Sequence, residues 1–142
     1  MPLTIKIKKL YDDTKMPCYA KPGDVALDMY SREAATLQPG ERKVFHTGFA
    51  LEFPEGFAAI VKDKGGIANA GVTTMGGVFD AGYRGEYNAQ LLNVGTEPYV
   101  VEKGDKVAQL MILPVEIVTL EEVEDLSDSE RADGRFGSTG KR

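Results

Sequence analysis

The sequence is poor in the residues that build disulfides and zinc sites. It has one cysteine, Cys18, and one histidine, His46. A single thiol excludes an internal disulfide framework and fits a reducing compartment, so we expect a cytoplasmic protein. No cluster of cysteine and histidine is present to hold zinc. One thiol with one histidine is also weak evidence for thiol catalysis, and we interpret both residues as structural or incidental.

Long apolar runs are missing too. A bilayer-spanning helix needs about 20 consecutive apolar residues, and no stretch approaches that length. The first ten residues, MPLTIKIKKL, alternate between apolar and polar instead of forming the apolar block of a secretory signal. We therefore expect no membrane partner.

The charge balance excludes another class of partner. The net charge is −5, which argues against a general nucleic-acid binder. Residues 116–130 are rich in acids and contain no base, whereas cations flank the glycine-rich segments elsewhere. An anionic small molecule, accompanied by Mg²⁺, therefore remains a possible substrate.

Alternating apolar residues indicate β-strands through most of the chain. Residues 3–7 and 45–53 alternate with period two, and turn signals such as Pro54-Glu55-Gly56 recur between such segments. Sixteen glycines and seven prolines leave little room for long helices, and only residues 65–71 favour one or two helical turns. The pattern predicts an all-β protein, a sandwich or barrel.

The C-terminal residues differ from this pattern. An acidic, Ser/Asp-rich stretch leads into RADGRFGSTGKR, residues 131–142. These glycines suggest a phosphate loop, but the motif G-x-x-x-x-G-K-[ST] needs glycine where Arg135 stands, so we reject it. We predict a β-domain over residues 1–120 and a mobile arm over 121–142. The arm either has no function or presents its one aromatic side chain, Phe136.

Two glycine-rich segments are candidate sites. GGVFDAGYRGEYNAQ, residues 76–90, predicts a hairpin that turns at Ala81-Gly82, with Asp80 at its tip. Asp80 is either a general base or a residue that only satisfies turn amides. In VKDKGGIANAG, residues 61–71, Lys64-Gly65-Gly66 either presents main-chain N–H groups to an anion or forms a plain turn.

Five ordered segments resemble the five motifs of the trimeric dUTPase family, and the resemblance covers nearly the whole chain. They are GDVALDMYS, DKGGIA, GVFDAGYRGE, GDKVAQL and RADGRFGSTG. The resemblance implies a jelly-roll-like β-barrel (a β-clip) and a homotrimer whose three sites each draw on all three chains. It also implies Mg²⁺-dependent hydrolysis of dUTP to dUMP and pyrophosphate, which limits uracil incorporation into DNA and supplies dUMP for dTMP synthesis.

The resemblance also assigns roles to individual residues. Asp80 would be the catalytic base, and Asp28 would act through metal-bound water or support the site. The main chain around Gly77, Val78 and Phe79 would pair with uracil, and Tyr83 would pack on the deoxyribose. The remaining substrate-binding residues it implies are Lys64, Gly65, Gly66, Gln109, Arg131, Phe136 (over the uracil), Gly137, Ser138 and Thr139.

The second motif departs from the family pattern. Lys64 and Gly65 stand where the family usually has arginine and serine, which removes a hydroxyl donor and a bidentate cation. The fifth motif carries Arg135 where glycine is usual. These changes keep a second hypothesis open, a catalytically weak dUTP-binding regulatory protein. A relative of dCTP deaminase is a third, although no general-base glutamate constellation occurs around residues 62–71.

Overall fold

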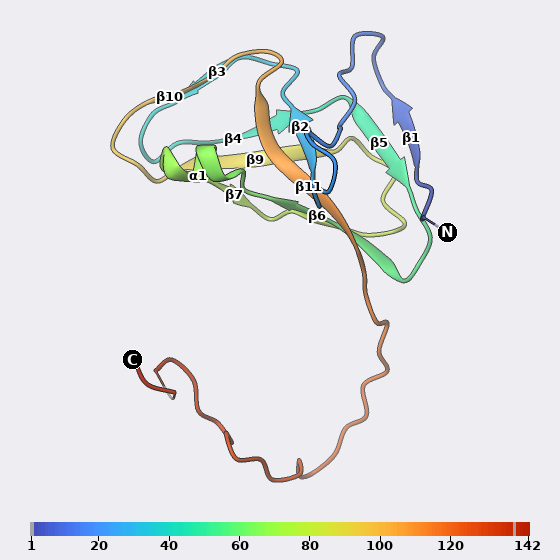
Figure 1. Cartoon of the computed structure of the whole chain (residues 1–142), viewed down its shortest axis with the longest axis vertical. Helices are drawn as coiled ribbons and strands as arrows, with labels where there is room; N and C mark the ends of the chain where they lie inside the picture. The colour runs from blue at the N-terminus through green and yellow to red at the C-terminus, as the bar shows by residue number, and fades with distance from the viewer. Residues whose placement is uncertain (1, 138) are drawn as a thin grey trace.

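The computed structural model describes residues 2–137 and 139–142, and its regular secondary structure consists almost entirely of β-strands (Figure 1). The all-β prediction is confirmed. The elements are β1 (Lys6–Lys9), β2 (Leu27–Tyr30), β3 (Ala35–Leu37), β4 (Arg42–His46), β5 (Phe49–Glu52), β6 (Phe57–Lys62), α1 (Gly65–Asn69), β7 (Val72–Met75), β8 (Val78–Phe79), β9 (Asn88–Asn93), β10 (Tyr99–Val101) and β11 (Lys106–Pro114). No helix in the described ranges has the length and apolarity needed to cross a membrane.

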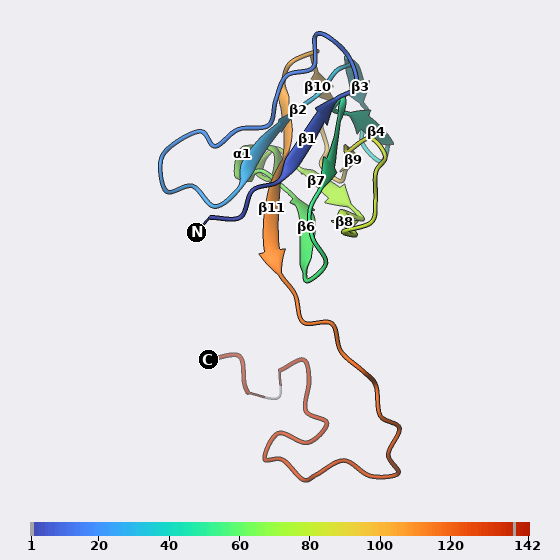
Figure 2. The same cartoon turned by 90° about the vertical axis from the view of Figure 1, so that its right-hand side faces the viewer.

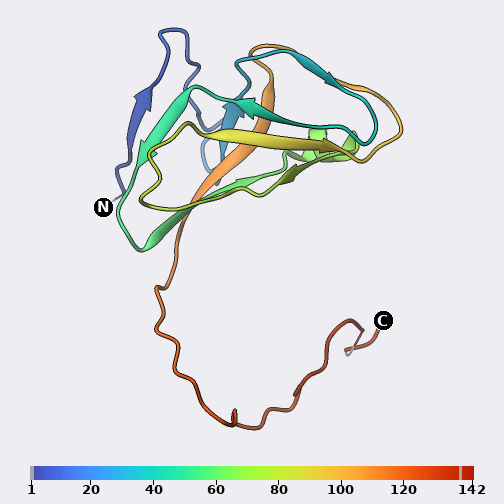
Figure 3. The ribbon, with the colours of Figure 1, turned by 180° about the vertical axis from the view of Figure 1, so that it is seen from behind.

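The strands form four small sheets that wrap around one core. The largest has the order β2-β11-β6-β8, and a three-stranded sheet has the order β4-β9-β7. Two-stranded ribbons, β1-β5 and β10-β3, close the remaining sides. All the strand pairs are antiparallel. Several of them join segments that are distant in the sequence: β11, for example, lies between β2 and β6 (Figures 1 and 3).

The core follows the alternation of the strands. In β9 every second side chain is buried, and Ala89 and Leu91 have no exposed surface. Phe45 and Phe49 are also completely buried, although a break between β4 and β5 separates them. Burying an aromatic or aliphatic side chain contributes about 1.5–3 kcal/mol, so this core supplies the rigid base on which the loops stand.

The glycine-rich segment after β6 forms the expected short helix, α1. Lys64 is its N-cap residue, and the helix ends where Gly71 adopts a φ of +91°. A Cβ at Gly71 would lie 2.8 Å from the Cα of Gly95, so only glycine fits there. The apolar Ile67 faces the core and fixes α1 against the barrel.

The predicted hairpin around Asp80 is wrong in its pairing. β8 does not pair with the strand that follows it; it pairs with β6, with Ala59 opposite Phe79. The chain returns to a strand only at Asn88, where β9 begins between β4 and β7. A turn does occur at the predicted place, since Tyr83 N donates to Asp80 O at 3.1 Å. The turn therefore connects two sheets and not two neighbouring strands, a difference that local alternation cannot reveal.

The last strand ends at Pro114, and the described residues after it form neither strand nor helix. They extend away from the barrel and then curve part of the way back toward it without joining a sheet (Figures 1 and 2). Large apolar side chains along this segment are exposed, including Ile117, Leu120 and Leu126.

Candidate functional site

Asp28 is the centre of a buried ion cluster. It lies in β2 and is 3% exposed. Lys64 Nζ donates to its Oδ1, and Lys106 Nζ lies 3.0 Å from its Oδ2, an ion pair without an aligned hydrogen bond. Burial raises the pKa of the Asp28 carboxyl, but the two ammonium groups outweigh burial and leave that pKa below its ordinary value. We call these three residues the Asp28 cluster.

A second acid, Asp63, fastens the loop that carries Lys64. Its carboxylate accepts hydrogen bonds from Thr74 N and Thr73 Oγ1, both at 2.8 Å, and from Thr74 Oγ1. Burial raises the pKa of Asp63, and the bonds from the two threonines more than offset it, so the pKa is lowered. The Gln109 amide donates to Asp63 O at 2.7 Å. Gln109 therefore braces this loop, a contact that its predicted phosphate role did not anticipate.

The first turn of α1 leaves open space beside the Asp28 cluster. Gly65 and Gly66 are exposed, and a Cβ built on either would meet no heavy atom within 4 Å. Neither residue has a positive φ. The glycines are therefore required neither by strain nor by crowding, and a ligand can approach the main chain here.

The Asp80 turn, residues 80–84, has an exposed acid at its start. Among the residues that the structure describes, no side chain or main-chain group forms a hydrogen bond or ion pair with the Asp80 carboxylate. The turn is held by other contacts: Arg84 Nη1 donates to Ala81 O at 2.6 Å. The Asp80 carboxylate is thus free for chemistry, and it does not serve the turn amides.

Main-chain groups of β8 lie at a free sheet edge next to Asp80. Val61 N donates to Gly77 O at 2.7 Å, so Gly77 and Phe79 direct their main-chain groups toward β6. Val78, between them, therefore directs its N–H and C=O away from β6, because antiparallel residues alternate in this way. Gly77 has a φ of +104°, and a Cβ there would lie 2.5 Å from Val61 O. Glycine is thus required for β8 to approach β6 so closely.

Aromatic rings fill the space behind the turn. Phe79 stacks on the fully buried Tyr87 with ring centroids 4.3 Å apart, and Tyr83 leans on Phe79 at 5.5 Å. Tyr83 Oη donates to Glu86 O at 3.0 Å. Gly85 makes this possible, since a Cβ there would lie 2.5 Å from Tyr83 Oη. Burial raises the pKa of Tyr87 to about 12, so Tyr87 stays neutral and packs.

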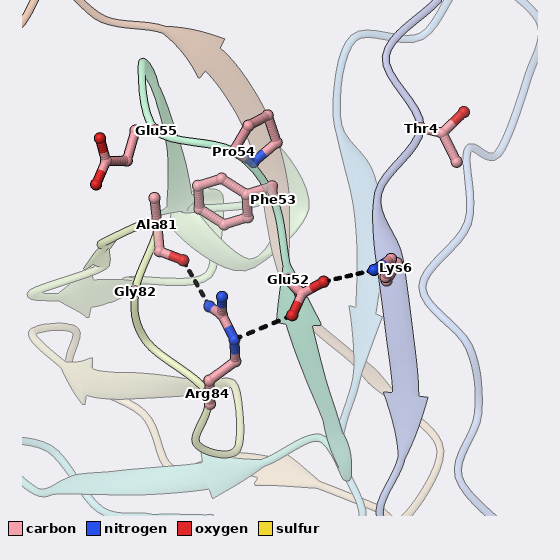
Figure 4. A pocket seen from close by; sticks show the side chains of 9 residues that line it. All are labelled: Thr4, Lys6, Glu52, Phe53, Pro54, Glu55, Ala81, Gly82 and Arg84. Atoms are coloured by element: carbon pink, nitrogen blue, oxygen red, sulfur yellow. Dashed lines mark hydrogen bonds and ion pairs between the residues drawn. The ribbon is translucent and has the colours of Figure 1, made fainter.

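A cavity of about 460 Å³ lies at the foot of the turn (Figure 4). Glu52 crosses it, with an ion pair to Lys6 at 2.8 Å and one to Arg84 at 3.5 Å. Ala81 and Gly82 line it, but Asp80 does not. The cavity therefore marks where β1 and β5 brace the Asp80 turn, not where the acid faces.

The two candidate sites lie far apart within one chain. Extending the β6–β8 register by one residue puts Asp80 opposite Ala58, six residues before Lys64. At about 3.3 Å per residue this separation is roughly 20 Å. Figure 2 shows β8 and α1 on opposite sides of β6. A single chain thus does not bring Asp80 to the Asp28 cluster.

The described residues of the arm form no hydrogen bond or ion pair with either site. Arg131 Nε donates to Gly134 O at 2.8 Å within the arm, and the Arg135 guanidinium lies 4.4 Å from the ring centroid of Phe136. Phe136 is 92% exposed. Gly137 has a φ of +84°, Thr139 is exposed, and Ser138 lies outside the described residues.

Metal-ligating side chains are dispersed. Within residues 2–137 and 139–142, no three His, Cys, Asp or Glu side chains are arranged to hold an ion. Asp28, which is deeply buried, is already paired with the ammonium groups of Lys64 and Lys106. This donor set does not fit an ion held by the protein alone, although it leaves room for one that arrives on a polyphosphate.

Comparison with known proteins identifies the family. Residues 12–140 match the family model described as dUTPase. A deoxyuridine 5'-triphosphate nucleotidohydrolase of Clostridium tetani is 44% identical, over 97% of each chain. The protein of the same name from Clostridioides difficile is 42% identical, over 96% of this chain and 97% of its own length. The chain belongs to the dUTPase family.

The fold agrees with this assignment. The G164S mutant of the Staphylococcus bacteriophage 80alpha dUTPase, solved with dUpNHpp, superposes with a TM-score of 0.90. It is 28% identical and covers 96% of this chain and 98% of its own. The jelly-roll-like β-clip prediction is confirmed for this dUTPase family member.

Sequence reasoning did not place Lys106 in the site of this dUTPase family member. On a regular strand, Lys106 and Gln109 face opposite sides, since side chains alternate. The contact between Lys106 and Asp28 depends on an irregularity of β11 that cannot be predicted from the sequence. The only sequence feature that pointed to Lys106 was its place among the cations that flank the glycine-rich segments.

Proposed function

We propose that this chain hydrolyses dUTP to dUMP and pyrophosphate. The observation that carries the proposal is the Asp80 carboxylate, exposed and without a partner in the described chain, beside the free main-chain edge of β8. The family membership and the 44% identity to a nucleotidohydrolase of that name support the same reaction.

Base selection is assigned to β8. The N–H and C=O of Val78 form an adjacent donor and acceptor at the free edge, which complements the alternating acceptor and donor on the edge of uracil. Cytosine presents the opposite order and would leave buried groups unpaired, at a cost of about 1–3 kcal/mol each. Tyr83, held by its bond to Glu86 O, offers a ring face to the deoxyribose.

The chemical step is assigned to Asp80. A water molecule hydrogen-bonded to its carboxylate attacks the α-phosphorus, and the carboxylate takes the proton that the water loses. The bond from the α-phosphorus to the bridging oxygen breaks, and pyrophosphate leaves with that oxygen. dUMP retains the oxygen that came from water.

The phosphates are assigned to Lys64, the main chain at Gly65 and Gly66, and Gln109. Arg131, Gly137, Ser138 and Thr139 are proposed to close over them, with Phe136 on the uracil face. Mg²⁺ that arrives with the triphosphate would neutralise charge on the phosphates, and Asp28 is the acid that would accept a hydrogen bond from its water.

We also propose a homotrimer with shared sites. The argument is geometric: Asp80 and Lys64 lie roughly 20 Å apart on one chain, farther than a triphosphate nucleotide bridges in a compact pose. A second copy that presents its Asp80 turn to the Asp28 cluster of the first removes this gap. The exposed arm, with Ile117 and Leu120 uncovered, is long enough to reach a third.

A nucleotide panel tests the reaction. The protein is incubated with dUTP, dCTP, dTTP or UTP and Mg²⁺, and both pyrophosphate and ammonia are measured. We expect pyrophosphate from dUTP alone. Ammonia from dCTP would favour a deaminase, and tight binding of dUTP without turnover would favour the regulatory alternative; either result contradicts the proposal.

Mixed chains test the sharing. Asp80→Asn and Lys64→Gln variants are each purified, unfolded, mixed and refolded together. Shared sites predict recovered activity, because some sites combine an intact Asp80 with an intact Lys64. A mixture as inactive as its two components, or a monomeric mass in light scattering, would contradict the trimer.

A further inference from the structure

A β-bulge in β11 turns Lys106 toward the buried acid. Gln109 lies opposite Asp28, but Lys106 lies opposite Tyr30, because the register slips by one residue between Lys106 and Ala108. Without the slip, Lys106 would project from the face opposite to Gln109 and therefore away from Asp28. With it, Lys106 shares a face with Tyr30 and Asp28, two residues apart on β2. Bulges commonly re-aim a side chain beside a functional site.

The result is one acid between two cations. The Asp28 side chain is 4% exposed, whereas those of Lys64 and Lys106 are 26% and 45% exposed. An anion from solvent can reach either ammonium group but not the carboxylate. The cluster also carries one positive charge in excess, which a single ion pair would not.

The second cation matters when a phosphate draws Lys64 away. If Asp28 had only Lys64, that movement would leave a buried carboxylate uncompensated, which is strongly unfavourable. Lys64 would then be held by its own acid, and phosphate would have to compete against it. A remaining partner on the other carboxylate oxygen removes most of this penalty.

We propose that Lys106 is a positioning residue for triphosphate binding: it keeps Asp28 compensated so that Lys64 can turn to the phosphates. This inference rests on the proposed function, since it takes the nucleotide as the anion that Lys64 meets. Lys106 itself acts through Asp28 and does not bind the phosphates.

Binding measurements with Lys106→Gln test the role. A non-hydrolysable dUTP analogue and deoxyuridine are titrated by calorimetry. We expect the affinity for the analogue to fall about tenfold, the loss of one partly solvated charge interaction, while the affinity for deoxyuridine stays unchanged. In turnover of dUTP, KM should rise with kcat nearly constant. Lys106→Arg should restore both values.

Variants in the Lys64 background separate positioning from direct contact. If Lys106 acts only through Lys64, Lys106→Gln costs no further affinity in a Lys64→Gln chain. An equal loss in both backgrounds overturns the proposal, because it shows direct attraction between Lys106 and phosphate. A parallel loss of deoxyuridine affinity also overturns it, because that result shows a general disturbance of the fold.

Folding is controlled with a second variant. Lys106→Met retains the apolar stem of the side chain, and its analogue and deoxyuridine affinities should match those of Lys106→Gln. Undiminished analogue binding by a folded Lys106→Met protein overturns the proposal. The proposed function fails on a different result, the absence of pyrophosphate when the unaltered protein meets dUTP.

Discussion

The two halves of the candidate site are prepared in opposite ways. In the Asp28 cluster the acid is buried and contacts two ammonium groups before any ligand arrives. In the Asp80 turn the acid is exposed, and only main-chain and aromatic contacts hold the loop. If the function is as proposed, the phosphate half, formed by the Asp28 cluster and the first turn of α1, has to open an ion pair when it binds phosphate. The half around Asp80 has no described contact of the carboxylate to break. The proposed phosphate binding and the proposed proton transfer therefore fall on different parts of the chain.

Removing the carboxylate of Asp80 should have the largest effect. Asp80→Asn keeps the shape of the turn but cannot take a proton from water, so kcat should fall by about 10²–10⁴-fold. Affinity for the non-hydrolysable analogue should remain within a factor of two or so, because no described contact depends on the carboxylate. Stopped-flow pyrophosphate release and calorimetry give the two numbers. Turnover at the normal rate would take the base role from Asp80.

Deleting residues 131–142 tests whether the arm completes both halves. We expect hydrolysis to drop about 100-fold, since the substrate is no longer enclosed. The melting temperature should not change, because the described residues of this segment touch no strand of the barrel. Phe136→Ala, a milder version, should lose less than the deletion does. A truncated protein with full activity would end the lid proposal.

Crowding at β8 can be separated from backbone strain with a matched pair of glycines. Gly76 and Gly77 both have positive φ, but only Gly77 lacks space for a Cβ. Gly77→Ala should lower the free energy of unfolding by roughly 3 kcal/mol. Gly76→Ala should lower it by about 1 kcal/mol, from strain alone. Urea denaturation measures both, and equal values would show that the close approach to Val61 O is unimportant.

Restoring a hydroxyl should strengthen the phosphate half. Gly65→Ser meets no steric obstacle, and a hydroxyl on the first turn of α1 can donate to a charged phosphate. Such a bond contributes about 1.5–3 kcal/mol when well placed, so KM for dUTP should fall about tenfold to 100-fold. Gly65→Ala adds the same Cβ without the hydroxyl and should leave KM nearly unchanged. An equal gain from alanine would point to helix stability instead.

Low pH should weaken the hydrogen bonds between the Asp63 carboxylate and the two threonines, which hold the loop that carries Lys64. The pKa of Asp63 is lowered in the folded protein, so its carboxylate stabilises the fold above the unfolded pKa near 4. That contribution disappears as the pH falls through the lower, folded value. Asp63→Asn should therefore be about 1 kcal/mol less stable than the unaltered chain at pH 7, with a difference that shrinks toward pH 3. Thermal melts across this range provide the test, and a constant difference would contradict it.

The sequence predicted the class of fold because alternation is a local property. The buried positions Phe45 and Phe49 follow from it, and the sequence of residues 65–71 indicated a short helix. It did not predict which strands pair. β8 joins β6 across a gap of 17 intervening residues from Ile60 to Val78, and no local pattern specifies such a partner.

The same distinction applies to the site. Asp80 and Asp28 were predicted as site residues from their motifs, but the contact between Lys106 and Asp28 depends on a slipped register. Gln109 was predicted to lie near a phosphate, whereas its hydrogen bond to Asp63 O was not predicted and is known only from the structure. Roles that depend on one residue type at a fixed spacing can be predicted. Roles that depend on where two strands meet require coordinates.

The free edge of β8 has a consequence for how this protein tolerates change. Its donor and acceptor belong to the peptide unit, and the Val78 side chain is 70% exposed and contributes nothing to them. Point mutations at this position can change the size or polarity of the side chain while the main-chain N–H and C=O remain available to a ligand. If this edge selects the base as proposed, that selection would tolerate substitutions of Val78, whereas a substitution of Gly77 would disturb it.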